Sequence, residues 1–127
     1  MPEETLVQQL IELYREGAIL NAFDRFFHKD VFMMQNGDIF AHSKAEGRAK
    51  LAAFFSSIRD LQVDIRAHRI VENASLLEVS YTFTDSHGKR VHFDGVHLHE
   101  WEGDQIIQEQ FATGDFIGEL FAEFDLE

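Results

Sequence analysis

Two histidines and a glutamate near the C-terminal end of the chain are the residues best suited to acid–base chemistry. His97 and His99 lie two residues apart in a run that reads as a β-strand, so both imidazoles point to the same face. Glu109 follows a turn at residues 103–104. A three-residue turn with a bulge would place Glu109 opposite His99, whereas a two-residue turn would place it opposite Leu98 on the other face.

The chemistry of this group depends on how close the carboxylate comes to an imidazole. If Glu109 approaches His99, it would raise the pKa of that imidazole and fix its tautomer, which gives an oriented acid–base pair. His97 would then be the proton-transfer group of a reaction that needs no cofactor. The alternative is that both histidines line a pocket or a subunit contact without doing chemistry, because polar groups in apolar pockets more often orient ligands than transform them.

The same residue types could bind a metal ion. A His-x-His pair with a nearby glutamate supplies ligands that Zn, Fe and Mn use, and it resembles part of the cupin motif. However, Glu102 follows His99 too closely for that motif, no second histidine-bearing motif follows, and the N-terminal segment reads as a helical hairpin. We therefore predict no metal and no cofactor.

The charge balance limits the class of partner. The 127 residues carry 23 acidic and 11 basic side chains, a formal net charge of −12, whereas binding nucleic acid or an anionic membrane surface requires clustered Lys and Arg. No apolar run approaches the roughly 20 residues of a membrane span. The chain has no cysteine and starts without the basic and apolar regions of a secretory signal, so we expect a cytoplasmic protein.

Thirteen phenylalanines are an unusual number for so short a chain. A core that only needs filling can use Leu, Ile and Val, so the surplus suggests a surface lined with aromatic rings, around a cavity or at a subunit contact. An aromatic core is the alternative.

The spacing of apolar residues predicts the elements that must position these side chains. We expect three helices, at residues 3–16, 19–28 and 44–58. A brief strand at residues 31–34 precedes the third helix. From residue 61 the period changes to two, which predicts four strands, at residues 62–71, 75–85, 89–101 and 105–113.

The short connections between these four strands force antiparallel neighbours, and Gly95 within one of them suggests a bend or bulge that curls the sheet. We therefore predict one α+β domain over residues 1–127, in which three N-terminal helices pack on a curved antiparallel sheet and leave a conical cavity. Residues 114–127 carry five acids and no Lys or Arg, and read as a short acidic helix with its Phe side chains turned inward.

Several segments match a known family in their order and spacing. They are FFHKDV at 26–31, GRAKLAAFF at 47–55, EVSYTF at 78–83, and FDGVHLHEW at 93–101 followed by GDQII at 103–107. Together they resemble the NTF2-like superfamily, which includes the SnoaL-like polyketide cyclases and the ketosteroid isomerases. The resemblance covers about residues 5 to 113 and implies a cystatin-like roll and a homodimer; because the functions of the superfamily vary widely, the fold alone says little about activity.

The resemblance also implies roles for individual positions. The general-base Asp of the isomerases matches Gln35, which cannot take a proton from carbon at neutral pH. His97 takes the place of the acid that donates a hydrogen bond to the developing oxyanion, and a histidine there could act as donor or as base. The tyrosine partner of that acid falls near Leu10, with Tyr14 one helical turn further along.

We therefore predict a protein whose pocket binds a small apolar or aromatic ligand. If it is an enzyme, it is an isomerase, cyclase or dehydratase in which His97 transfers the proton and Glu109, which the family pattern places opposite His99, orients a histidine. We expect the ligand site to be lined by Tyr14, Gln35, Phe54, Tyr81, His99 and Trp101. The alternative is a non-catalytic dimeric module whose cavity is vestigial and whose sheet or Phe-rich tail mediates assembly.

Overall fold

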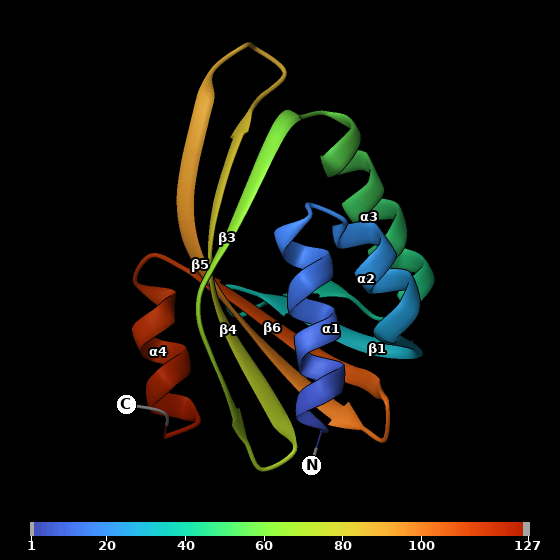
Figure 1. Ribbon diagram of the computed structural model, residues 1–127. Coiled ribbons are helices and arrows are strands. Elements are labelled where there is room, and N and C mark those ends of the chain that lie inside the picture. The colour runs from blue at the N-terminus through green and yellow to red at the C-terminus, as the bar shows by residue number, and fades with distance from the viewer. Residues whose placement is uncertain (1, 126–127) are drawn as a thin grey trace.

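Three helices cover the inner face of a curled sheet and a fourth helix lies on its outer face, in a computed structural model that describes residues 2–125 (Figure 1). The helices are α1 (Glu4–Arg15), α2 (Ile19–Phe26), α3 (Lys44–Ser56) and α4 (Phe116–Glu123). The strands are β1 (Phe27–Gln35), β2 (Asp38–Ala41), β3 (Arg59–Val71), β4 (Ala74–Thr84), β5 (Arg90–Glu102) and β6 (Gln105–Thr113). The α+β class and the three N-terminal helices are as predicted. A C-terminal helix is present as well, but α4 spans only Phe116–Glu123 and Phe116 is exposed rather than turned inward, while residues 126–127 of the predicted segment lie outside the described residues.

The six strands form one sheet in the order β2-β1-β6-β5-β4-β3. Strands β3 to β6 form the predicted antiparallel meander. The sheet is not wholly antiparallel, however, because β1 pairs in parallel with β6. Short connections force antiparallel pairing only between strands that are consecutive in the chain. Strands β1 and β6 are separated by most of the chain, so the relative direction of these two strands could not be predicted in this way.

The first strand is longer than predicted and belongs to a hairpin. Helix α2 ends at Phe26, and β1 runs for nine residues before a turn at Asn36 and Gly37 leads into β2. Both turn residues have positive φ, 51° and 82°, which is the conformation that an Asn-Gly pair adopts in a two-residue hairpin turn. The Asn36 side chain also pairs with Thr113 of β6, at 3.0 Å to its hydroxyl and 2.8 Å to its backbone nitrogen, which ties the hairpin to the sheet.

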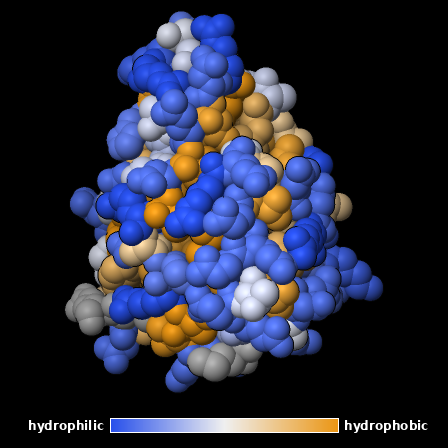
Figure 2. Space-filling view, viewed as in Figure 1, coloured by the Kyte–Doolittle hydropathy of each residue, from blue (hydrophilic) through white to orange (hydrophobic). Residues whose placement is uncertain are grey.

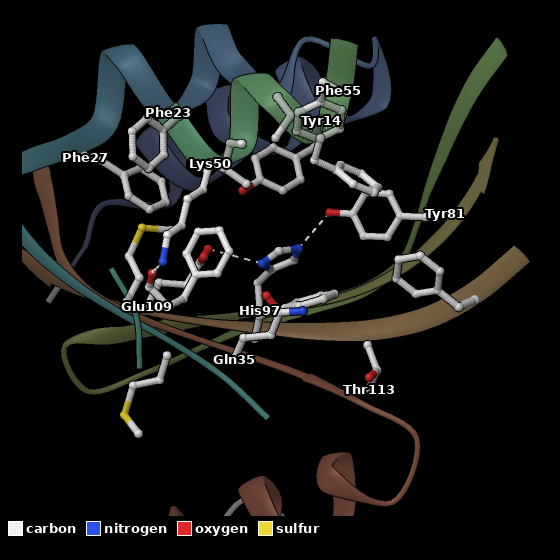
Figure 3. A pocket seen from close by; sticks show the side chains of 18 of the residues that line it. Tyr14, Phe23, Phe27, Gln35, Lys50, Phe55, Tyr81, His97, Glu109 and Thr113 are labelled. Atoms are coloured by element: carbon white, nitrogen blue, oxygen red, sulfur yellow. Dashed lines mark hydrogen bonds and ion pairs between the residues drawn. The ribbon is translucent and has the colours of Figure 1, made fainter. Parts of the chain in front are cut away.

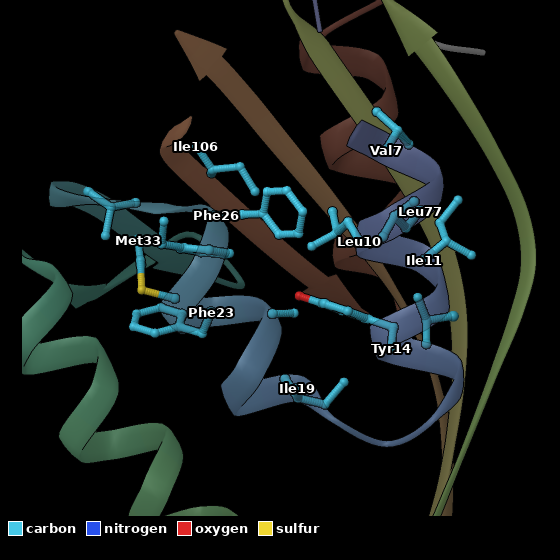
Figure 4. Close-up of a cluster of buried hydrophobic side chains, with 14 of the residues drawn as sticks. Val7, Leu10, Ile11, Tyr14, Ile19, Phe23, Phe26, Met33, Leu77 and Ile106 are labelled. Atoms are coloured by element: carbon cyan, nitrogen blue, oxygen red, sulfur yellow. The ribbon is translucent and has the colours of Figure 1, made fainter. Parts of the chain in front are cut away.

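Helix α1 supplies one wall of the inner core (Figure 4). Its buried residues, Val7, Leu10, Ile11 and Tyr14, recur at helical spacing and face the sheet. Burying an aliphatic side chain of this size stabilises a fold by roughly 1.5–3 kcal/mol. The core residues of α1 and α2 therefore hold both helices firmly across the inner face.

Of the bend or bulge that the sequence suggested at Gly95, the structure has no bulge at this position, although the sheet is curled as expected (Figure 1). Pairing with β4 continues through Gly95 without a shift, pairing with β6 begins at Gly95, and the irregularity in β5 lies between Glu100 and Trp101. The glycine is needed for another reason: a Cβ at this position would lie 2.5 Å from Cε1 of Phe111. The missing side chain leaves room for the Phe111 ring on the inner face.

The outer face of the sheet carries a smaller apolar cluster under α4. Leu120 of α4 is buried against four side chains of the sheet, those of Leu76, Val96, Leu98 and Ala112. Ile117, Phe121 and Phe124 pack around this cluster. Across residues 2–125, the structure has no helix that combines the length and the apolar character needed to cross a membrane.

Candidate functional site

A cavity of about 450 Å³ lies between the helices and the inner face of the sheet. Its volume is within the range of sites that bind drug-sized molecules. The walls are mostly aromatic, with rings from the helices and from β4, β5 and β6. On the surface, apolar side chains gather below the polar tip of the β4–β5 hairpin (Figure 2).

Helix α3 covers one side of this cavity, and a glycine lets it approach. A Cβ on Gly47 would lie 2.7 Å from Sδ of Met33 and 3.2 Å from Cζ of Phe23, so the helix can pack on β1 only without a side chain there. Further along α3, Phe54 lines the cavity while remaining 42% exposed, and its ring meets Phe83 of β4 edge-on at 5.5 Å.

One polar cluster interrupts the aromatic lining (Figure 3). His97 of β5 lies between two partners, with Nδ1 at 3.1 Å from Oε2 of Glu109 and Nε2 at 2.7 Å from the Tyr81 hydroxyl. His99 Nε2 lies 2.6 Å from the same Glu109 oxygen. All four side chains are buried, so the cluster is a hydrogen-bonded network in an apolar surrounding.

Glu109 lies opposite His99, which is the pairing that the sequence favoured, but a different turn produces it. Glu109 pairs with His99, although the turn at Gly103 and Asp104 has only two residues. Glu102 pairs with Gln105 across that turn, and a register shift further along the hairpin moves Glu109 to the inner face. A bulge therefore does what a longer turn would have done.

Glu109 is ionised although it is buried. Burial alone would raise the pKa of this carboxyl group, but the charge of a protonated His97 and the hydrogen bonds from His97 and His99 outweigh burial and hold the pKa well below its usual range. An ionised carboxylate only accepts hydrogen bonds. Oε2 therefore accepts an N–H from each imidazole, from Nδ1 of His97 and from Nε2 of His99.

The pKa of His99 is lowered, whereas its approach to a carboxylate was expected to raise it. Burial dominates because the ring is fully enclosed, and it outweighs the favourable contact with Glu109. The second ring nitrogen, Nδ1, is buried with no hydrogen-bond partner among the described residues. Protonating it would bury an unpaired N–H, so His99 stays neutral with its proton on Nε2.

Two tyrosines remain phenols at this site. Burial, together with the nearby Glu109 charge, raises the pKa of Tyr14 and of Tyr81 well above the ordinary value. Tyr14 of α1 lies with its ring edge-on to His97 at 5.5 Å, and its hydroxyl points into the space in front of the cluster (Figure 3). Its place is one turn from the position that the resemblance indicated for a tyrosine.

Most of the predicted lining residues meet at this cavity, and two do not. Tyr14, Gln35, Phe54, Tyr81, His97 and Glu109 line it. His99 and Trp101 share the inner face of β5 with His97 but lie outside the lining. His99 is enclosed between Glu109 and neighbouring rings, while Trp101 packs on Phe26 and donates Nε1–H to Ser75 at 2.9 Å, because α1 and α2 fill this end of the sheet.

Phe111 is a site residue that the sequence analysis did not single out. Its ring stacks on the His97 imidazole with centroids 4.4 Å apart and an interplanar angle of 28°. A signal was present, since Phe111 lies two residues after Glu109 and must share its face on a strand.

The ligand atoms of His97, His99 and Glu109 lie within 4.8 Å of one another, a spacing that could also surround a cation. In the structure, both imidazoles instead direct an N–H to one carboxylate oxygen. A divalent cation would have to displace both protons, so metals belong in any binding test.

A family model described as the SnoaL-like domain matches residues 7–109. Among curated proteins, none matches the chain significantly. Solved structures show the same fold, and one similar structure is a candidate SnoaL-like polyketide cyclase from Mesorhizobium loti, with a TM-score of 0.74 and 19% identity over 87% of this chain and 98% of that chain.

Two further structures extend this similarity. A protein from Catenulispora acidiphila with a ketosteroid isomerase-like fold, in complex with trimethylamine, has a TM-score of 0.69 and 15% identity over 87% of this chain and 85% of that one. A cystatin-fold protein from Novosphingobium aromaticivorans has a TM-score of 0.70 and 22% identity over 84% and 94%. At these identities the comparison shows the fold alone.

Proposed function

The chain belongs to the SnoaL-like domain family, and from this premise we propose that its cavity binds a small apolar or aromatic molecule with one polar group held at the His97–Glu109 end. One observation carries the proposal: a buried, hydrogen-bonded polar cluster lies in the wall of a cavity of about 450 Å³ whose lining is mostly aromatic and aliphatic. Burying a charge costs stability even when the charge is paired, so a charge retained in a mostly apolar cavity favours a functional use. A ligand with a flat apolar body and one oxygen would satisfy both parts of the lining.

We further propose that the site transfers a proton without a cofactor, as an isomerase, cyclase or dehydratase does. Among the residues that the structure describes, His97 is the only histidine in the lining, and Glu109 orients it through Nδ1. Gln35, an amide with no proton-accepting side chain at neutral pH, occupies the place where the resemblance would put a carboxylate base. The base in this chain is therefore His97 rather than a residue on β1.

A thermal-shift screen tests this function. The panel contains steroids, polyketide-like aromatics, small carbonyl compounds and divalent metals, because a ligand that binds only the native state raises the melting temperature. The test variant is His97→Ala and the matched control is His92→Ala, an exposed histidine of the same strand.

A shift that persists in His92→Ala and disappears in His97→Ala supports the proposal. An organic hit that shifts both variants equally contradicts a site at His97. A shift given by metals alone would replace the proton-transfer function with a metal site.

Assembly is the second candidate function, and one feature favours it. Phe116 of α4 is 43% exposed, although Ile117, Leu120 and Phe121 of this helix pack in the cluster on the chain's own sheet. We propose a homodimer, to be tested by cutting the chain after Gly114 and measuring mass by light scattering. If the truncated protein keeps the oligomeric state of the full chain, the tail is not the dimer contact.

A further inference from the structure

Neither ring nitrogen of His97 is free to meet a ligand. Nδ1 is directed at Glu109 and Nε2 at the Tyr81 hydroxyl, with donor–acceptor distances of 3.1 and 2.7 Å. One ring face is stacked on Phe111, and the edge of Tyr14 approaches as well. Only 8% of the residue remains exposed. A proton that His97 takes from a ligand, or gives to it, must therefore pass through another group.

We propose that the Tyr81 hydroxyl is the catalytic group that touches the ligand, and that His97 acts through it. Tyr81 lines the cavity from β4, and its hydroxyl is held by His97 (Figure 3). This inference rests on the proposed function for the existence of the ligand. It moves the point of contact with the ligand from the imidazole to the phenol.

The direction of the hydrogen bond between Tyr81 and His97 depends on the proton count of His97. When His97 is neutral, the Glu109 carboxylate holds its proton on Nδ1, and Nε2 has a lone pair that accepts the Tyr81 O–H. The tyrosine then offers an oxygen lone pair to the cavity. In this state Tyr81 accepts a hydrogen bond, which suits a ligand hydroxyl.

When His97 is protonated, the direction reverses. Nε2–H donates to the Tyr81 oxygen, and the phenolic hydrogen is free to turn toward the cavity. Tyr81 is then a donor, which suits a ligand carbonyl or the oxyanion formed from one. A compound that exchanges between a carbonyl and an enol would use both states.

The corresponding proton transfer is balanced within the chain. The ligand O–H proton moves to the Tyr81 oxygen while the Tyr81 proton moves to Nε2 of His97. The ligand becomes an oxyanion, Tyr81 is unchanged, and His97 becomes an imidazolium next to the Glu109 carboxylate. The reverse step returns the proton, so no co-reactant is needed.

The groups around His97 are few, so its protonation has a defined electrostatic setting. Glu109 faces it from β6, Tyr81 from β4, Tyr14 from α1, and the neutral His99 from β5. From α3, Lys50 reaches the cavity wall, but its Nζ donates to the Phe40 carbonyl at 2.7 Å. Within residues 2–125, Glu109 is thus the one charged group hydrogen-bonded to this imidazole.

NMR of the free protein tests the hydrogen-bond direction without any ligand. Histidine ring nitrogens are labelled with ¹⁵N, His97 is assigned with His97→Ala, and its tautomer is read at high pH in the wild type and in Tyr81→Phe. We expect neutral His97 to carry its proton on Nδ1, and we expect the Nε2 resonance to move toward a free lone pair in Tyr81→Phe. A proton on Nε2, or an Nε2 resonance that Tyr81→Phe does not change, would overturn the proposal.

Calorimetric binding of two probes tests the contact with a ligand. 2-Naphthol offers a hydroxyl and 2-acetylnaphthalene offers a carbonyl on the same ring system. Above the titration midpoint of His97, as NMR measures it, 2-naphthol should bind better, and below it 2-acetylnaphthalene should. Tyr81→Phe should weaken both by roughly five- to tenfold, the range for losing one hydrogen bond, and abolish the pH-dependent preference.

Tyr14→Phe is the matched variant, because it removes a second buried phenol hydroxyl from the cavity lining and leaves the Tyr81–His97 pair intact. It should keep the pH-dependent preference. If the probes bind and Tyr81→Phe keeps that preference, this inference fails while the proposed function stands. If neither probe binds the wild type at any pH, the proposed ligand site itself is contradicted.

Discussion

The two faces of the central strands differ in what they bury: the outer face buries an apolar cluster, and the inner face buries a polar cluster beside a cavity. On the outer face, the apolar side chains of Leu76, Val96 and Leu98 pack under Leu120 of α4. On the inner face, the same strands carry His97, His99, Glu109 and Tyr81 around a cavity of about 450 Å³. A void and a buried charge each lower stability, so the inner face gives up stability that the outer face keeps, as expected of a functional site.

The largest effect should come from removing the charge on the inner face. Glu109→Gln leaves two imidazole N–H groups without their shared carboxylate, and we expect a loss of about 3 kcal/mol in the free energy of unfolding. Urea denaturation measures it, with the exposed Glu102→Gln on the same hairpin as control, expected within about 0.5 kcal/mol of wild type. Equal losses in the two variants would mean that the cluster is not a buried network.

The outer face should be sensitive to volume instead of charge. Leu120→Ala removes the one fully engaged side chain of α4, and we expect a loss of about 2–3 kcal/mol with no change in binding to the cavity. Phe116→Ala, on the same helix but exposed, is the control and should cost less than about 1 kcal/mol. A Leu120→Ala protein with native stability would show that α4 is not packed on the sheet.

Gly95→Ala adds a single methyl group, but it should displace the Phe111 ring at the site. The new methyl group would lie within 3 Å of the Phe111 ring, which stacks on His97. We expect a loss of roughly 1–2 kcal/mol in stability and a displaced Phe111, seen as changed aromatic NMR shifts. The control is Gly118→Ala on α4, where a Cβ meets nothing within 4 Å; the same loss there would point to a backbone effect.

The smallest effect concerns how the free energy of unfolding depends on pH, to which His99 and Glu109 should contribute over different pH ranges. The folded pKa of His99 is lowered, so the unfolded chain binds a proton first and stability falls as the pH drops below about 6.5. The folded pKa of Glu109 is also lowered, so its contribution is present above about 4.5 and is lost below that. His99→Phe should remove the first decline and keep an acid decline, as followed by denaturation between pH 8 and 3. A first decline that persists would contradict a neutral buried His99.

Local patterns predicted the meander and its inner face well, because a strand's period of two assigns Tyr81, His97 and Phe93 to one side. They could not predict the parallel pairing of β1 with β6, which depends on contacts between distant parts of the chain. Local patterns also could not predict how much of the conical cavity α1 and α2 fill. His99 and Trp101 were therefore expected in the cavity lining, which neither residue reaches. The predicted rise in the pKa of His99 was wrong for the same reason, because the packing of α1 and α2 determines how deeply this imidazole is buried.

Chemical-shift mapping with the best organic hit of the thermal-shift screen tests the central claim most directly. We predict that ring resonances of Tyr81, His97 and Phe111 move on binding, while methyl resonances of Leu76, Leu98 and Leu120 on the outer face do not. Shifts confined to the outer face would contradict the inner cavity as the ligand site.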